Sequence, residues 1–303
     1  FLGPFATDKA VAELRDKLHP SEPLLSQYVN YMVDFFSGDW GFSYTTGEPV
    51  ARQLAERLPA TIELGLYAFV FALVVAVALA LLAAYRRGPI SDGGARAVSF
   101  FGLGVPPFWF GLMLLVLFFE QLNWLPGPEG RLALERAPPP EVTHLYTIDA
   151  LIHGRFATLI DALKHIVLPA ITLGLLPLAF LLRLLRANLL DVSHELFITV
   201  ARSKGMGRWA AFVRHALPNA FLPTLAAAGL LLGQLLAGSV LVEKVFNWPG
   251  AGALVTDGIL RQDFSVVQAF ILVSAVIYVL ANLVVDVLSG FVDPRVRQPA
   301  SIG

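Results

Sequence analysis

The most informative residues of this chain lie between positions 199 and 218, where a basic, hydrophilic segment separates two strongly apolar ones. Ala201 and Gly205 are four residues apart, and Leu217 and Pro218 follow this glycine by twelve and thirteen residues. A small alanine allows another chain to approach closely, and a glycine permits a tight backbone turn. The segment therefore predicts a surface on which a partner protein docks. The alternative is a surface connection that merely joins two membrane spans.

This spacing resembles the signature E-A-A-x3-G-x9-I-x-L-P of the membrane subunits of bacterial ABC importers. Thr199, Val200 and His215 stand where that signature has Glu, Ala and Ile, and these departures are typical of its peptide and nickel permease branch. The resemblance implies a short cytoplasmic helix that docks into a groove on an ATP-hydrolysing subunit. The residues that it assigns to this coupling site are Thr199, Val200, Ala201, Arg202, Lys204, Gly205, Met206, Gly207, Leu217 and Pro218.

Other segments are similar to the dipeptide, oligopeptide and nickel permeases, and in particular to the first of their two paired permeases. They are Gly38-Asp39-Trp40-Gly41, the run from Pro106 to Gly111, the run from Glu243 to Gly250 and Asp293-Pro294-Arg295, whereas the loop from 120 to 165 matches poorly. The resemblance implies four kinds of partner: a second homologous permease, two ATP-binding subunits, an extracytoplasmic substrate-binding protein and the lipid bilayer of the bacterial inner membrane. ATP and Mg would bind at the partner subunits, with no cofactor on this chain, and nucleic acid is not an expected partner.

The chain lacks the motifs by which it would be an enzyme in its own right. His194-Glu195 begins like a zinc-protease motif but has no second histidine one turn later, and no P-loop sequence occurs. Gly250 and Gly252 lack the third glycine of a dinucleotide-binding fingerprint. With no cysteine and six scattered histidines, we expect no metal site. The sequence predicts a transport subunit without an ATPase site of its own.

The composition indicates an all-α polytopic membrane protein. Hydrophobic residues make up 56% of the chain and charged residues 15%, and the mean hydropathy of +0.67 is too high for a soluble globule of this length. Because an open strand cannot satisfy its backbone groups in lipid, apolar segments long enough to cross a bilayer must be helices. Five such spans are expected, at residues 64–85, 97–119, 166–182, 216–242 and 264–285. In the second span, Pro106 and Pro107 predict a kink.

The distribution of Lys and Arg predicts the orientation of these spans. If residues 86–97, 183–215 and 293–303 face the cytoplasm, those short segments hold 11 of the 22 basic residues, which satisfies the positive-inside rule. The transmembrane domain is then 64–292, with an external segment at 1–63, an external loop at 120–165, a cytoplasmic coupling loop at 183–215 and a cytoplasmic tail at 293–303. An external start requires a sixth span ahead of Phe1, which we expect to precede the sequence given.

Candidates for a transport pathway or gate lie near the ends of the last spans. Glu243, Phe246 and Trp248 follow an apolar span directly, so they suit an aromatic anchor at the membrane interface. The permease resemblance instead places them near an external gate. Both interpretations remain open from the sequence.

Three polar residues inside the spans are further candidates. Asp286 is the only acid of the fifth span and lies at its cytoplasmic end, and a carboxylate at membrane depth is costly enough to indicate a function or a basic partner. Gln234 and Asn282 either line the pathway or join neighbouring helices by hydrogen bonds.

Taken together, these features predict the permease subunit of an ATP-driven importer for di- or oligopeptides or a related solute such as nickel. The subunit would form half of the pathway. One alternative is an ion-coupled secondary transporter, which would be expected to carry repeats and several buried charges. The other is an intramembrane enzyme, for which no nucleophile and base pair is apparent.

Overall fold

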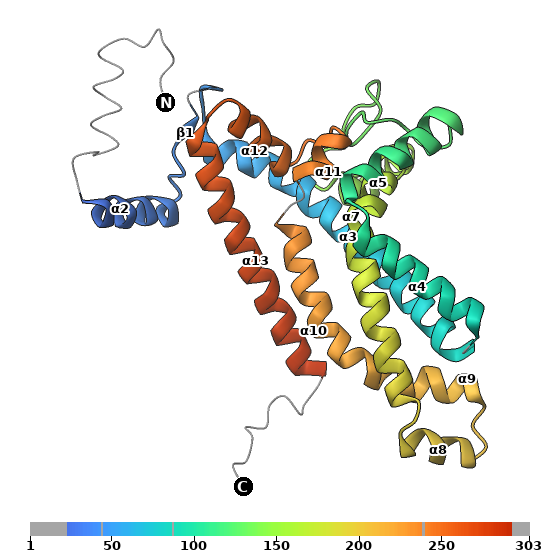
Figure 1. Ribbon diagram of the computed structural model, residues 1–303. Helices are drawn as coiled ribbons and strands as arrows, with labels where there is room; N and C mark the ends of the chain where they lie inside the picture. The colour runs from blue at the N-terminus through green and yellow to red at the C-terminus, as the bar shows by residue number, and fades with distance from the viewer. Residues whose placement is uncertain (1–22, 44, 87, 238–239, 293–303) are drawn as a thin grey trace, which may run out of the picture.

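The computed structural model describes residues 23–43, 45–86, 88–237 and 240–292 (Figure 1). The predicted tail from 293 to 303 and the first 22 residues of the predicted external segment lie outside these ranges. Within them the chain is predominantly helical, with a long loop between residues 121 and 146 and one short antiparallel pair of strands, β1 (Phe42–Ser43) and β2 (Glu48–Pro49). The helices are α2 (Leu24–Ser37), α3 (Val50–Arg86), α4 (Pro89–Gly104), α5 (Pro107–Leu114), η1 (Leu115–Gln121), α6 (Tyr146–Ile152), α7 (Phe156–Val192), α8 (Leu196–Ser203), α9 (Arg208–Ala211), η2 (Phe212–Ala216), α10 (Leu217–Leu236), α11 (Val240–Val245), α12 (Ala251–Leu260) and α13 (Phe264–Val292).

The long helices confirm the predicted class of an all-α polytopic membrane protein. Among the described residues, four helices are long and apolar enough to cross a bilayer: α3, α7, α10 with the short helices before it, and α13. A fifth span exists only if the bent pair formed by α4 and by α5 with η1 is counted as one. In Figure 1, α3 and α7 form the centre of the bundle, with α4 against one side and α10 and α13 on the other.

The second predicted span, 97–119, is broken rather than continuous. Its two halves meet at Val105 and Pro106 and are bent by 110° relative to one another. Pro107 is the first residue of α5, where its missing N–H costs the helix nothing and its fixed φ starts the new direction. The prolines thus produce the kink expected from the sequence, and the bend is large enough to separate two helices.

Two helices are longer than predicted because polar residues continue them beyond their apolar centres. The helix α7 was expected at 166–182 but spans 37 residues, and α3 begins at Val50 instead of residue 64. At the start of α7, the carboxylate of Asp161 lies 3.4 Å from the guanidinium of Arg136, so a charge there has a partner. The helix α10 ends earlier than predicted, at Leu236 instead of residue 242.

The centre of the bundle is a close contact between α3 and α7. Ala68, Ala72, Ala76 and Ala80 recur every fourth residue of α3 and each is 0% exposed. A Cβ atom at Gly174 of α7 would lie 2.7 Å from the carbonyl oxygen of Ala68. Small side chains on both helices therefore let the two backbones approach, which is how helices associate within a membrane where hydrophobic burial offers little.

Candidate functional site

The predicted coupling segment forms the tip of the bundle beyond α7, where α8 and α9 lie next to each other (Figure 1). The helix α8 is held by Ile198, which is buried in the same core cluster as Leu189 of α7 and Phe212 of η2. Its other faces expose Leu196, at 81%, together with Phe197 and Val200. A short helix that is anchored on one side and apolar on its free sides is suited to contact with a partner protein.

Gly205 ends α8 in the left-handed backbone conformation, with φ of +87°. The N–H of Gly205 donates to the carbonyl of Arg202 at 3.0 Å, and the N–H of Met206 donates to the carbonyl of Ala201 at 3.3 Å. These two bonds are the Schellman pattern that closes a helix C-terminus. A Cβ atom at Gly205 would meet no atom within 4 Å, so the backbone conformation rather than space favours glycine here.

A hollow of about 460 Å³ opens beside this helix end. It is lined by Phe197, Val200, Ala201, Lys204, Gly205, Met206 and His215. The structure thus brings Val200, Ala201, Lys204, Gly205 and Met206, five of the predicted coupling residues, to one concave surface.

The remaining predicted coupling residues lie around that surface. Thr199 and Arg202 are exposed on α8, and Gly207 directly precedes α9. Leu217 packs on the core cluster at the start of α10. Pro218 follows the π-helical turn η2, and a widened turn accommodates a residue that has no N–H to donate.

The sequence did not single out the contact that joins this tip to the first described span. The Nη2 atom of Arg208 donates to the carbonyl oxygen of Tyr85 at 2.7 Å, and its guanidinium lies 4.8 Å from the centre of the Tyr85 ring. The ring of Trp209 packs edge-on against Tyr85 with 5.0 Å between centroids. A basic residue followed by tryptophan was visible in the sequence, but its partner lies 123 positions away.

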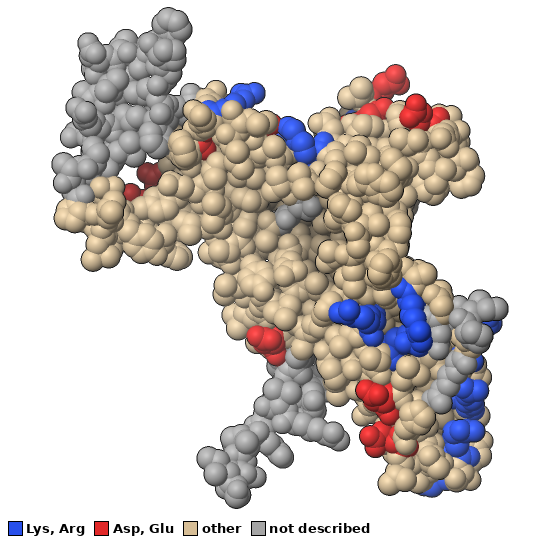
Figure 2. All heavy atoms as spheres, in the orientation of Figure 1, with Lys and Arg blue, Asp and Glu red and all other residues tan. Residues whose placement is uncertain are grey.

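Positive charge gathers at the same tip. Figure 2 shows Lys and Arg side chains over α8 and α9, with acidic side chains only on one flank. Arg202, Lys204, Arg208 and Arg214 supply this charge, and all four are exposed. The tip therefore combines apolar contact area with a basic rim, as protein interfaces do.

The three candidates near α11 lie at the other end of the bundle, and they are buried. Phe246 is 3% and Trp248 1% exposed, so neither is the lipid-facing interfacial anchor that one interpretation of the sequence expected. The indole N–H of Trp248 donates to the carbonyl of Ala60 at 2.8 Å. Both aromatic rings are thus part of the packing between α3, α7 and α11.

Glu243 is completely buried in this region. Its Oε1 accepts a hydrogen bond from the hydroxyl of Thr61 and its Oε2 accepts one from the N–H of Ala253, both at 2.8 Å. A Cβ atom at Gly250 would collide with this carboxyl group, which explains the glycine after Trp248-Pro249. Burial raises the pKa of Glu243 to about 7, although these hydrogen bonds and the charge of Arg57 oppose the shift.

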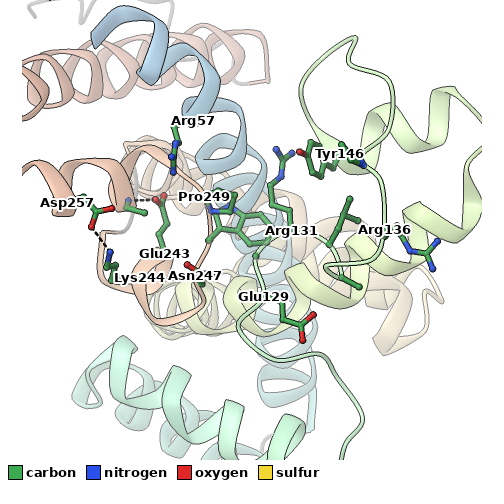
Figure 3. Close-up of a pocket in the computed structure, with 16 residues that line it drawn as sticks. Arg57, Glu129, Arg131, Arg136, Tyr146, Glu243, Lys244, Asn247, Pro249 and Asp257 are labelled. Carbon is green, nitrogen blue, oxygen red and sulfur yellow. Dashed lines mark hydrogen bonds and ion pairs between the residues drawn. The ribbon is translucent and has the colours of Figure 1, made fainter. Parts of the chain in front are cut away.

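A polar cavity of about 370 Å³ lies next to Glu243 (Figure 3). The long loop after η1 forms one of its walls and is fastened to α3 by an ion pair that the sequence did not predict. The Nη2 atom of Arg131 lies 2.6 Å from Oε2 of Glu63, and both side chains are buried. The N–H and the hydroxyl of Thr147 donate to Oε1 of Glu63 at 2.8 and 2.7 Å. This loop is therefore bound to the bundle at a defined place.

The polar candidates within the spans do not join this site. Gln234 is exposed on α10, and Asn282 is partly buried where α13 packs against Gly233. Asp286 is exposed on α13, and within the described part of the chain no basic side chain pairs with it. The six predicted pathway residues thus lie at several levels of the bundle.

Comparison with known families identifies the chain. The family described as "Binding-protein-dependent transport system inner membrane component" matches residues 76–298, which include α8, its terminal glycine and the helices that hold them. The chain belongs to this family. It is therefore the inner-membrane permease component of an ABC importer, and permease subunits of this kind are not themselves enzymes.

Named relatives resemble this permease along nearly its whole length. The probable D,D-dipeptide transport system permease protein DdpB of Escherichia coli is 41% identical, over 97% of this chain and 86% of the relative. The dipeptide transport system permease protein DppB of Alkalihalophilus pseudofirmus is 37% identical, over 98% and 88%. The glutathione transport system permease protein GsiC of Escherichia coli is 33% identical, over 97% and 87%.

Proposed function

We propose that this permease imports short peptides and that α8 is the helix through which ATP-hydrolysing subunits drive it. The names of its relatives support the cargo, since they refer to dipeptides, to di- and tripeptides and to glutathione, which is itself a peptide. Nickel, the other solute class of the sequence resemblance, is less well supported by these names.

The proposed assembly contains this chain, a second homologous permease, two ATP-binding subunits and an external binding protein. ATP and Mg would bind to the ATP-binding subunits, and this chain would hold no cofactor or metal. The observation that carries the proposal is the free apolar surface of α8: Leu196, Phe197 and Val200 are exposed, the last two line a hollow, and Gly205 ends the helix. In this arrangement α8 faces the cytoplasm.

A mechanical route from this surface into the membrane is available. Ile198 connects α8 to the cores of α7 and η2, and Arg208 connects the next helix to Tyr85 at the end of α3. A displacement of α8 by closure of the ATP-binding subunits would therefore move the ends of two packed spans together. Rigid-body motion of this kind is a common way to switch between two states.

The experiment is purification of the permease with its encoded partners, followed by ATPase measurements in proteoliposomes. We expect the ATP-binding subunits to copurify in stoichiometric amounts, and we expect ATP hydrolysis to rise when the binding protein is loaded with dialanine but not with Ni²⁺. Transport by the purified permease alone, driven by an ion gradient, would instead support a secondary transporter. Stimulation by Ni²⁺ and not by dialanine would contradict the peptide assignment.

A further inference from the structure

The polar cavity next to Glu243 lies at the end of the bundle opposite α8. Among the cationic side chains that line it, one has no carboxylate partner and another has a donor without an acceptor, as far as the described residues go. It is enclosed by α3, by the loop that contains Arg131 and by the segment from α11 to α12 (Figure 3). Its volume of about 370 Å³ falls within the range of small-molecule sites. The side chains that matter are Arg57, Glu129, Arg131, Lys244 and Asp257.

Arg131 is held in place but retains an unused donor. It is 8% exposed, its Nη2 atom donates to Glu63 and to the carbonyl of His144, and its guanidinium lies 3.4 Å from the ring centre of Tyr146. Its Nε atom is buried and has no hydrogen-bond acceptor in the described part of the chain. Buried donors without a partner are rare in proteins, so an acceptor that the chain itself does not supply is expected here.

Arg57 supplies a cation that, unlike Arg131, has no carboxylate partner in the part of the chain that the structure describes. It extends from α3 toward Glu243 (Figure 3), yet no carboxylate of the described residues forms an ion pair with it. The buried Glu243 carboxyl is already bound by Thr61 and Ala253. Lys244, in contrast, is neutralised by Asp257 at 2.7 Å. The guanidinium of Arg57, unpaired among the described residues, and the unused Nε donor of Arg131 thus remain for a ligand of this cavity.

We propose that this cavity binds the carboxylate of a small solute through the guanidinium of Arg57 and the Nε atom of Arg131. The planar guanidinium group is the side chain best matched to a carboxylate. This inference rests on the proposed import of short peptides, which makes the C-terminal carboxylate of the peptide the group that is bound. Glu129, an exposed acid on the same cavity whose carboxylate lies 4.0 Å from Nε2 of His165, would receive the peptide ammonium group.

The test is equilibrium binding of radiolabelled dialanine, and of its C-terminal amide, to the assembled transporter without the binding protein. We expect dialanine to bind and the amide to bind about tenfold more weakly or worse, because a charge-assisted hydrogen bond is lost. Arg57→Gln should weaken dialanine binding by a similar factor. Arg52→Gln is the matched control, since Arg52 lies on the same helix, is exposed and pairs with Glu56 away from the cavity.

Arg131→Lys adds an independent variant, because lysine keeps a positive charge for Glu63 but has no atom equivalent to Nε. We expect it to weaken dialanine binding while the complex still assembles. Equal binding of dialanine and its amide, no binding of dialanine at all, or unchanged binding by Arg57→Gln would overturn the inference.

Two further results distinguish peptide binding in this cavity from docking of the binding protein and from the proposed function itself. If Arg57→Gln weakens only the docking of the binding protein, the cavity receives an acidic side chain of that protein, and the inference is wrong. If ATP hydrolysis responds to the dialanine-loaded binding protein while free dialanine does not bind the cavity, the inference fails but the proposed function stands.

Discussion

Arg208 and Tyr85, far apart in the sequence, join the start of α9 to the end of α3 through a 2.7 Å hydrogen bond to a main-chain carbonyl. Because the acceptor belongs to the backbone, this hydrogen bond needs no side chain other than that of the arginine. The same guanidinium also lies over the Tyr85 ring, which adds a cation–π interaction. In the proposed mechanism, a displacement of α8 and α9 would be passed through this contact to α3, which packs along α7.

Arg208→Gln should therefore uncouple ATP hydrolysis from transport without unfolding the permease. We expect the number of peptides moved per ATP to fall roughly 2- to 30-fold, which corresponds to the usual 0.5–2 kcal/mol range of coupling energies. The measurement is parallel peptide uptake and ATPase activity in proteoliposomes. Arg214→Gln is the control, because Arg214 is exposed at the same tip and lies on η2. An equal effect of both substitutions would point to a general loss of positive charge.

Gly205→Asp and Ala201→Arg should abolish transport while the permease still inserts. The first places a side chain where φ is +87° and an additional charge at the hollow, and the second fills the hollow itself. Copurification of the ATP-binding subunits and peptide uptake are the two measurements. Gly154→Asp is the matched control, because Gly154 also has positive φ, at +65°, and open space around a Cβ atom, but it follows α6. Full transport by both coupling variants, at normal expression, would refute the role of this surface.

Glu63→Gln should destabilise the permease strongly. It leaves the buried Arg131 cation without its counter-charge, a change that costs about 3–5 kcal/mol in other buried pairs. Glu56→Gln is the control, because it breaks only the exposed pair with Arg52 and should change the unfolding midpoint little. Thermal unfolding of the purified complex in detergent would compare the two. Similar midpoints for both variants would mean that the loop is not held by the Glu63–Arg131 pair.

The stability of the permease should depend on the protonation of Glu243, which lies in α11 outside the apolar spans. Burial raises its pKa from 4.5 to about 7, and Arg57 from α3 is the cation that opposes this shift. A raised carboxyl pKa means that Glu243 keeps its proton to a higher pH in the folded state than in the unfolded chain. The contribution of Glu243 to the free energy of unfolding is therefore fully present below about pH 4.5 and is lost as the pH rises through about 7.

Glu243→Gln, which imitates the protonated form, should remove this contribution to the pH dependence. The difference should be on the order of 3 kcal/mol between the two limits, and the measurement is unfolding of both proteins at pH 5, 6, 7 and 8. Parallel pH profiles for the two proteins would show that Glu243 is not protonated in the folded permease at neutral pH.

Much of this architecture could be predicted from the sequence because lipid imposes simple demands on composition. The long apolar segments were enough to predict an all-α polytopic membrane protein, and the paired prolines at 106 and 107 indicated a bend. The size of that bend could not be predicted, since it depends on how the two halves pack against α7 and α11. The Ala201–Gly205 spacing predicted a coupling surface, and this role stays a prediction; the hollow beside Gly205 could not be predicted, because His215 of η2 also lines it. The Glu63–Arg131 pair could not be predicted, because it joins residues 68 positions apart across an irregular loop.

The orientation of the bundle in the membrane remains a prediction from charge, and the structure suggests how to test it. The native chain has no cysteine, so single cysteines report their own positions. Ser203, at the end of α8, is exposed, and Ser203→Cys should react with a membrane-impermeant thiol reagent only from the cytoplasmic side. Glu141 is exposed on the long loop near the opposite end and is a suitable site for the external probe. The Glu141→Cys variant should be labelled in intact cells, and the Ser203→Cys variant only after the cells are permeabilised. Labelling of both from one side would show that α8 and the loop from 120 to 165 do not lie on opposite faces of the membrane.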